Sequence, residues 1–95
     1  MDKCKLENAR CNIDRINSEL VSLLIERMNN VDKVAEYKAA HGMPINVPER
    51  EKSILEKVSQ LAGNEYAEDV IPVFQAIFAA SCHREERKIK MEAHA

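Results

Sequence analysis

Apolar residues recur every three or four positions along the first 40 residues of the chain, which is the spacing of an amphipathic helix. Two later segments, at about 47–62 and 67–89, carry the same spacing. We therefore predict an all-α protein with three helices per protomer, the first of them very long, from about residue 5 to residue 40. The apolar stripe of that first helix runs through Leu6, Ala9, Ile13, Ile16, Leu20, Leu23, Arg27, Val31, Val34 and Lys38.

Glycine and proline mark where the predicted helices end. Gly42 can adopt the left-handed conformation that closes a helix, and Pro44 cannot continue one. The second helix is expected to end near Gly63, and the third to begin around residues 66–69. Pro72 then falls close to the first turn of the third helix, where its missing N–H group is tolerated.

The first predicted helix is longer than a domain of this size is wide. About 36 residues at ~1.5 Å each extend roughly 54 Å, whereas a compact chain of 95 residues is about 32 Å across. Because neither proline nor glycine interrupts residues 5–40, the helix must overhang its own domain. We expect one domain over residues 1–95, a frayed tail at 90–95, and an intertwined homodimer that covers the exposed stripe.

Two cations of the first helix, Arg27 and Lys38, stand at positions of the predicted core. A buried cation without a partner is costly, so this pattern indicates a bound anion, although both side chains are long enough to reach the surface. The two residues differ by about 20° in direction and ~16 Å along the axis, so they can converge on one ligand. Arg10 lies about 25 Å from Arg27 and would reach such a site only across the interface of an antiparallel dimer.

The other two predicted helices also direct polar groups inward. Arg50 and Glu51 lie one turn before an apolar pair, and Ser81 and Glu85 continue the stripe that begins at Phe74. Taken singly, these residues also fit a first-turn charge cluster, a small packing residue and part of an exposed charged run. Their coincidence on separate helices favours one polar site.

Composition narrows the classes of partner. The formal net charge is −2 and the basic residues are dispersed without aromatic residues between them, which argues against nucleic acid and anionic membranes. The N-terminal residues carry no signal-peptide core and no run of 18 apolar residues occurs, so a cytoplasmic protein is expected. Three cysteines without CxxC spacing predict reduced thiols, and no metal site is expected.

The ordered set of polar positions resembles the all-helical (AroQ-type) chorismate mutases over roughly residues 6–88. The resemblance includes the segment at 13–20, Ile-Asp-Arg-Ile-Asn-Ser-Glu-Leu, and the segment at 44–51, Pro-Ile-Asn-Val-Pro-Glu-Arg-Glu. It implies a three-helix protomer in an intertwined homodimer. The implied reaction is the Claisen rearrangement of chorismate to prephenate in aromatic amino-acid biosynthesis, which requires no cofactor. The set of positions is Arg10, Arg27, Lys38, Arg50, Glu51, Ser81 and Glu85.

The resemblance also implies a role for each of these residues. Arg27 and Arg10 of the partner subunit would hold the two substrate carboxylates. Lys38 would donate to the ether oxygen, where negative charge develops, and Glu51 would accept from the ring hydroxyl. Fixed cations in a dry cavity suit this unimolecular reaction, because it needs a folded substrate and a stabilised oxygen rather than a nucleophile.

Further positions complete the implied site or depart from the family pattern. Arg50 and Ser81 would complete the carboxylate contacts and the pocket wall. Val47 stands where many relatives have Asp, which removes one polar group beside the ring hydroxyl. Glu85 stands where Gln is frequent. Since a carboxyl donates a hydrogen bond only when protonated, we expect Glu85 to act as a neutral acid.

Two other functions fit the same sequence features. Isochorismate-pyruvate lyases share the fold and much of the cationic site, but act on an isomer whose hydroxyl lies elsewhere on the ring. Glu51, as an acceptor for the chorismate hydroxyl, favours the mutase. A catalytically silent helical dimer that binds or regulates another enzyme would have no need of charged residues at core positions.

Overall fold

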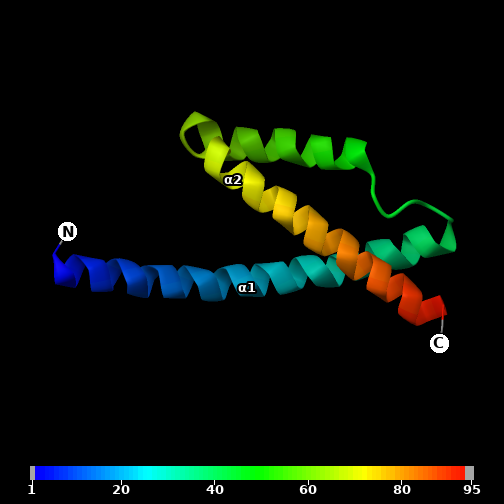
Figure 1. Cartoon of the computed structure of the whole chain (residues 1–95), viewed down its shortest axis with the longest axis horizontal. Helices are drawn as coiled ribbons and strands as arrows, with labels where there is room; N and C mark the ends of the chain where they lie inside the picture. The colour runs from blue at the N-terminus through cyan, green and yellow to red at the C-terminus, as the bar shows by residue number, and fades with distance from the viewer. Residues whose placement is uncertain (1, 94–95) are drawn as a thin grey trace. The chain divides into compact units, whose positions relative to one another are not determined.

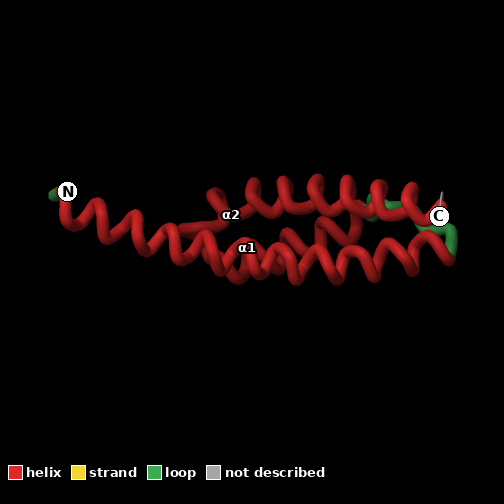
Figure 2. Tube along the Cα trace, turned by 90° about the horizontal axis from the view of Figure 1, so that it is seen from below, coloured by secondary structure: helices red, strands yellow, loops and turns green. Residues whose placement is uncertain are grey.

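A computed structural model describes residues 2–93, and within that range the chain is helical and without strands. It contains two helices, α1 (Lys3–Ala40) and α2 (Pro48–Ala93), joined by the loop at residues 41–47 (Figures 1 and 2). The all-α prediction is confirmed. The predicted count of three helices is wrong, because both later helices lie within α2.

The chain divides into two compact units, Met1–Asn30 and Val31–Ala95, and the boundary falls inside α1. The first unit consists of the N-terminal part of α1. The second consists of the remainder of α1, the loop and α2. A single domain over residues 1–95 remains a prediction, and the two units are described separately below.

Both ends of α1 are closed by specific hydrogen bonds. The carboxylate of Asp2 accepts the backbone N–H of Lys5 at 2.9 Å, which caps one of the unpaired N–H groups of the first turn. At the other end, Gly42 has a φ of 62° and the N–H of Met43 donates to the carbonyl of Lys38 at 2.8 Å. This is the left-handed closure that the sequence predicts, and it fixes the backbone at Lys38.

The two predicted C-terminal helices are joined by a single glycine. Gly63 has φ 77° and ψ 171°, torsion angles that are not helical and that only glycine adopts readily. Figure 1 shows an abrupt change of direction within α2. The sequence predicts a short loop here instead, but one residue suffices because helical hydrogen bonding resumes directly after it.

The helix after Gly63 differs from prediction at both of its ends. Pro72 lies inside α2, well past the first turn in which the sequence predicts it. The helix continues through it without non-helical torsion angles at that position, at the cost of one backbone hydrogen bond. At the other end α2 runs to Ala93, into the tail expected to fray, whose residues 94 and 95 lie outside the described range.

The unit at 31–95 has a small core that is partly polar. Ala35 is fully buried, and Val58 and Phe78 are 7% exposed. Ser81 and Glu85 are buried beside them, as the helical spacing of these residues predicts. Phe74 meets Phe78 edge to face, with ring centroids 6.4 Å apart. The core therefore ends in a hydroxyl and a carboxylate rather than in apolar side chains.

The unit at 1–30 has no buried residue among the described residues 2–30. The apolar stripe predicted from the sequence lies in the open, with Ile13 53%, Leu20 50% and Leu23 61% exposed. Such a row of large apolar side chains is unfavourable in water.

Replacing Gly63 with alanine is expected to destabilise the fold. The added methyl group meets no atom within 4 Å, so the cost comes from backbone torsion angles alone and amounts to about 1–3 kcal/mol. Urea unfolding of Gly63→Ala measures it. D-alanine at the same position, introduced by chemical synthesis, is the matched control because it favours positive φ. An unfolding midpoint for Gly63→Ala equal to or above that of the unsubstituted chain would contradict the prediction.

Candidate active site

Lys38 and Glu85 form a buried ion pair in the unit at 31–95. The ammonium Nζ of Lys38 lies 3.0 Å from Oε1 of Glu85, and the two side chains are 12% and 6% exposed. Nζ also donates to the backbone carbonyl of Ile45 at 2.7 Å, which ties the loop at 41–47 to this centre. Among the described residues these are the acceptors of Lys38, and its third N–H can donate to a bound ligand.

Ser81 lies one turn before Glu85 on the same face of α2 and is 8% exposed. Its hydroxyl donates to the carbonyl of Ile77 at 2.8 Å. This bond keeps a small polar group buried within its own helix. Donation to a ligand carboxylate requires the hydroxyl to rotate away from that carbonyl.

Glu51 lies in the first part of α2 and lines a groove whose lining residues do not include Lys38, Ser81 or Glu85. This groove of about 490 Å³ is lined by Glu51, by Ile45 and Asn46 of the loop, and by residues that include Phe78 and Cys82. The groove combines apolar walls with a few polar groups, which suits a small organic ligand. Val47, the departure from the family pattern, does not line it, whereas its neighbour Asn46 does.

The pKa of the Cys82 thiol is shifted by burial and by charged residues around this groove. Burial raises the pKa of the thiol above its ordinary value, and the carboxylates of Glu51 and Glu85 raise it further. The ammonium of Lys38 acts in the opposite direction. Three of the residues selected from the sequence, on both helices and on both sides of the kink in α2, therefore act on one half-buried thiol.

The remaining predicted residue of this unit, Arg50, is exposed in the first turn of α2. Its predicted inward direction is therefore wrong for the single chain. Glu51, its neighbour, is half-buried and also lines a second groove of about 700 Å³, together with Leu55 and Ile71. Adjacent residues of a helix differ by ~100° in direction, and here Glu51 rather than Arg50 is turned toward the grooves.

Arg10 and Arg27 belong to the other unit. Arg10 is exposed and Arg27 is half-buried, both on α1. Seventeen residues of helix separate them by about 25 Å, so one small ligand cannot contact both within a single chain.

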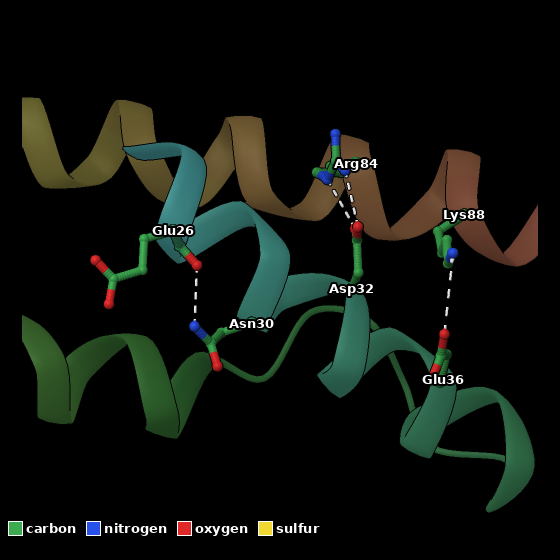
Figure 3. Close-up of polar contacts among 6 residues, drawn as sticks. All are labelled: Glu26, Asn30, Asp32, Glu36, Arg84 and Lys88. Carbon is green, nitrogen blue, oxygen red and sulfur yellow. Dashed lines mark hydrogen bonds and ion pairs between the residues drawn. The ribbon is translucent and has the colours of Figure 1, made fainter. Parts of the chain in front are cut away.

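A pair of charged residues that the sequence did not single out joins α1 to α2. The guanidinium of Arg84 donates from Nε and Nη2 to the two carboxylate oxygens of Asp32, at 2.7 and 2.8 Å (Figure 3). These bonds hold the pKa of Asp32 below its ordinary value, against the effect of desolvation, and raise that of Arg84. The sequence carried a weak signal for this pair, since Asp32 and Arg84 each directly neighbour a position on a predicted inward face.

The described residues contain neither a candidate metal-binding group nor a helix that could span a membrane. No three His, Cys, Asp or Glu side chains of residues 2–93 come together in a group that could hold a metal ion. Over the same range, neither helix contains a stretch long and apolar enough to span a bilayer. The cysteines at 4, 11 and 82 are all free thiols.

The comparisons with known proteins identify the family of the chain. The model of the chorismate mutase type II family matches residues 9–86, so the chain belongs to that family. It is 36% identical over 69 residues to the chorismate mutase of Methanocaldococcus jannaschii, covering 73% of this chain and 70% of the relative. It is also 36% identical over 92 residues to the bifunctional chorismate mutase/prephenate dehydratase of Aquifex aeolicus.

The relatives differ in how much of their length this chain spans. The alignment covers 92% of the chain but 25% of the Aquifex aeolicus protein. A T-protein of Enterobacter agglomerans is 43% identical over 51 residues, which is 54% of this chain and 14% of that protein. Family membership therefore rests on the shared helical segment, and the larger relatives contain further sequence.

Proposed function

We propose that this protein is a chorismate mutase that converts chorismate to prephenate by an intramolecular Claisen rearrangement. The observation that carries the proposal is the buried Lys38–Glu85 pair, held against the Ile45 carbonyl in a chain of the chorismate mutase type II family. The reaction breaks the ether C–O bond and forms a C–C bond within one molecule. It therefore needs neither a cofactor nor a second substrate.

Lys38 is proposed to donate its third N–H to the ether oxygen of the substrate. Negative charge grows on that oxygen as its bond to the ring breaks, so a fixed cation stabilises the transition state more than the ground state. Burial supports this role, because a charge acts more strongly where water is excluded. The contacts to Glu85 and Ile45 hold the ammonium in place before the substrate arrives.

Glu51 is proposed to accept the hydrogen bond of the ring hydroxyl. Its position in the 490 Å³ groove supports this role, since the apolar walls can enclose a carbon ring. Asn46 lines the same groove and can supply the polar group that Val47 does not. Ser81 is proposed to form part of the carboxylate-binding wall after its hydroxyl turns from Ile77.

The substrate carboxylates are proposed to bind Arg27 and Arg10 of the partner subunit, with Arg50 completing the contacts. The arrangement requires a homodimer in which the N-terminal parts of α1 pack together. The exposed stripe that includes Ile13 and Leu20 supports this assembly, because a second copy would cover it. The separation of Arg10 from Arg27 along α1 supports a contribution across the interface. A cytoplasmic location remains a prediction.

Turnover of chorismate by the purified protein tests the proposal, with the product identified by mass spectrometry. Prephenate supports the mutase. If the protein instead releases pyruvate from isochorismate, the related lyase replaces it. Absence of turnover of both substrates, and of binding to a bicyclic dicarboxylate that mimics the transition state, would leave a silent helical dimer.

Lys38→Ala is expected to lower kcat/KM by about 10²–10³-fold, corresponding to the ~3–4 kcal/mol that one such donor contributes. The matched control is Lys33→Ala, which removes an exposed lysine of the same helix. Steady-state kinetics with chorismate measure both variants. Equal losses in the two variants would contradict the specific role of Lys38.

Activity is expected to fall as the pH rises from about 4.5 to 8.5, if Glu85 donates to the ether oxygen as a neutral carboxyl. In the structure Glu85 contacts the Lys38 ammonium, so the pH profile tests whether the carboxyl or the carboxylate acts in the site. Glu85→Gln should flatten the pH profile, because an amide donates at any pH. If the unsubstituted protein has a flat profile, Glu85 acts instead as the ionised partner of Lys38.

Mixing two inactive variants tests the contribution of Arg10 across the interface. Arg10→Ala and Lys38→Ala are each expected to be nearly inactive as homodimers. After joint refolding, random pairing restores about one site in four, because half of the dimers contain one intact site. Arg10→Ala refolded with a chain that carries both substitutions is the control and should remain inactive. Failure of the first mixture to recover activity would exclude sharing of the site.

A further inference from the structure

Charged contacts between α1 and α2 lie on both sides of the buried Ala35, and the contacts of each side are called a line below. One line contains Asp32–Arg84 and, one turn further on, Glu36–Lys88, whose Oε1 and Nζ atoms lie 3.9 Å apart (Figure 3). The other line contains the Lys38–Glu85 pair at 3.0 Å. The absence of a large side chain at position 35 allows the two helices to approach closely between the lines.

Helix geometry explains why the lines lie on opposite sides. Viewed along α1, Asp32 and Lys38 point about 60° to either side of Ala35. On α2, Arg84 and Glu85 are adjacent and differ by ~100° in direction. A rotation of α2 about its axis that kept one contact would therefore break the other. Each pair restrains the geometry of the other pair.

The two pairs differ in how strictly they define orientation. An ammonium is a compact charge that can donate to a carboxylate in many directions, so the Lys38–Glu85 contact alone leaves α2 rotational freedom. The guanidinium of Arg84 instead forms two parallel hydrogen bonds to Asp32, at 2.7 and 2.8 Å. This bidentate arrangement requires both planar groups to be aligned.

We propose that Asp32 and Arg84 are positioning residues whose bidentate contact sets the rotation of α2, so that Ser81 and Glu85 face Lys38. This inference rests on the function proposed above for Lys38 and Glu85. The side chains of Arg84 and Asp32 are 38% and 20% exposed, and ion pairs of such exposure add little to stability. They act through geometry, because even a small displacement of the reacting groups lowers the rate of the reaction strongly.

Chemical labelling of Lys38 tests the positioning without any assay of activity. Arg84→Lys keeps the positive charge but loses the planar fork, and Asp32→Asn keeps the shape but loses the carboxylate. Both variants are expected to raise the rate at which acetic anhydride modifies Lys38 several-fold, as mapped by mass spectrometry. The rate at Lys33, which is exposed, should not change.

Two matched controls separate positioning from a general loss of stability. Glu36→Gln removes the longer contact one turn along the same line and should leave the labelling of Lys38 unchanged. Gly63→Ala lowers stability at a distance and should also leave it unchanged at a temperature where the chain is folded. Unchanged labelling in both Arg84→Lys and Asp32→Asn would overturn the proposal. So would an equal rise in the two controls.

Kinetics then test whether the positioning acts through Lys38. Arg84→Lys is expected to lower kcat for chorismate about 10-fold with a smaller change in KM. In a Lys38→Ala background the same substitution should have a smaller effect, because one partner of the Lys38–Glu85 contact that it positions is absent. The exchange of Asp32→Arg with Arg84→Asp should recover part of kcat.

An additive loss of kcat in the Lys38→Ala background would overturn the proposal, since a structural role lowers both backgrounds equally. Failure of the proposed function has a different signature. In that case the unsubstituted protein does not convert chorismate, while the labelling of Lys38 still reports whether Asp32 and Arg84 set its position.

Discussion

The buried contact between Lys38 and Glu85 is the constraint on which the arrangement of residues 31–95 depends. Two charges removed from water require each other and further hydrogen bonds, and the Ile45 carbonyl supplies one of them. This requirement brings together the end of α1, the loop after it and the last turns of α2. The small side chain of Ala35 permits that approach. A core built around this pair is less apolar than usual, but it offers a fixed cation to a ligand.

The sequence predicted the features that depend on helical spacing. The long first helix, its closure at Gly42 and the burial of Ser81 and Glu85 all follow from periodicity and from the conformational freedom of glycine. The interior position of Lys38 follows in the same way, because its spacing from the apolar residues places it on the inward face of the helix. The interior position of these three polar residues could therefore be predicted, because each of them continues a regular apolar pattern.

Features that depend on a particular partner or on one torsion angle were not predictable in this way. Gly63 turns the chain within one residue, whereas its sequence context is equally compatible with a short loop. Pro72 is accommodated inside α2, although its chemistry suggests a helix start. The Arg84–Asp32 contact joins residues 52 positions apart, and an exposed charged run gives no indication of which member finds a partner.

The geometry at Gly63 has a consequence for the shape of the groove. Glu51 precedes this residue and Cys82 follows it, yet both line the same groove, so its width depends on the two torsion angles at Gly63. Changes near the turn can therefore alter which ring substituents fit without touching Lys38 or Glu85. Under the proposed function, the turn at Gly63 therefore gives the chain a way to change the shape of the groove while the contact between Lys38 and Glu85 is kept.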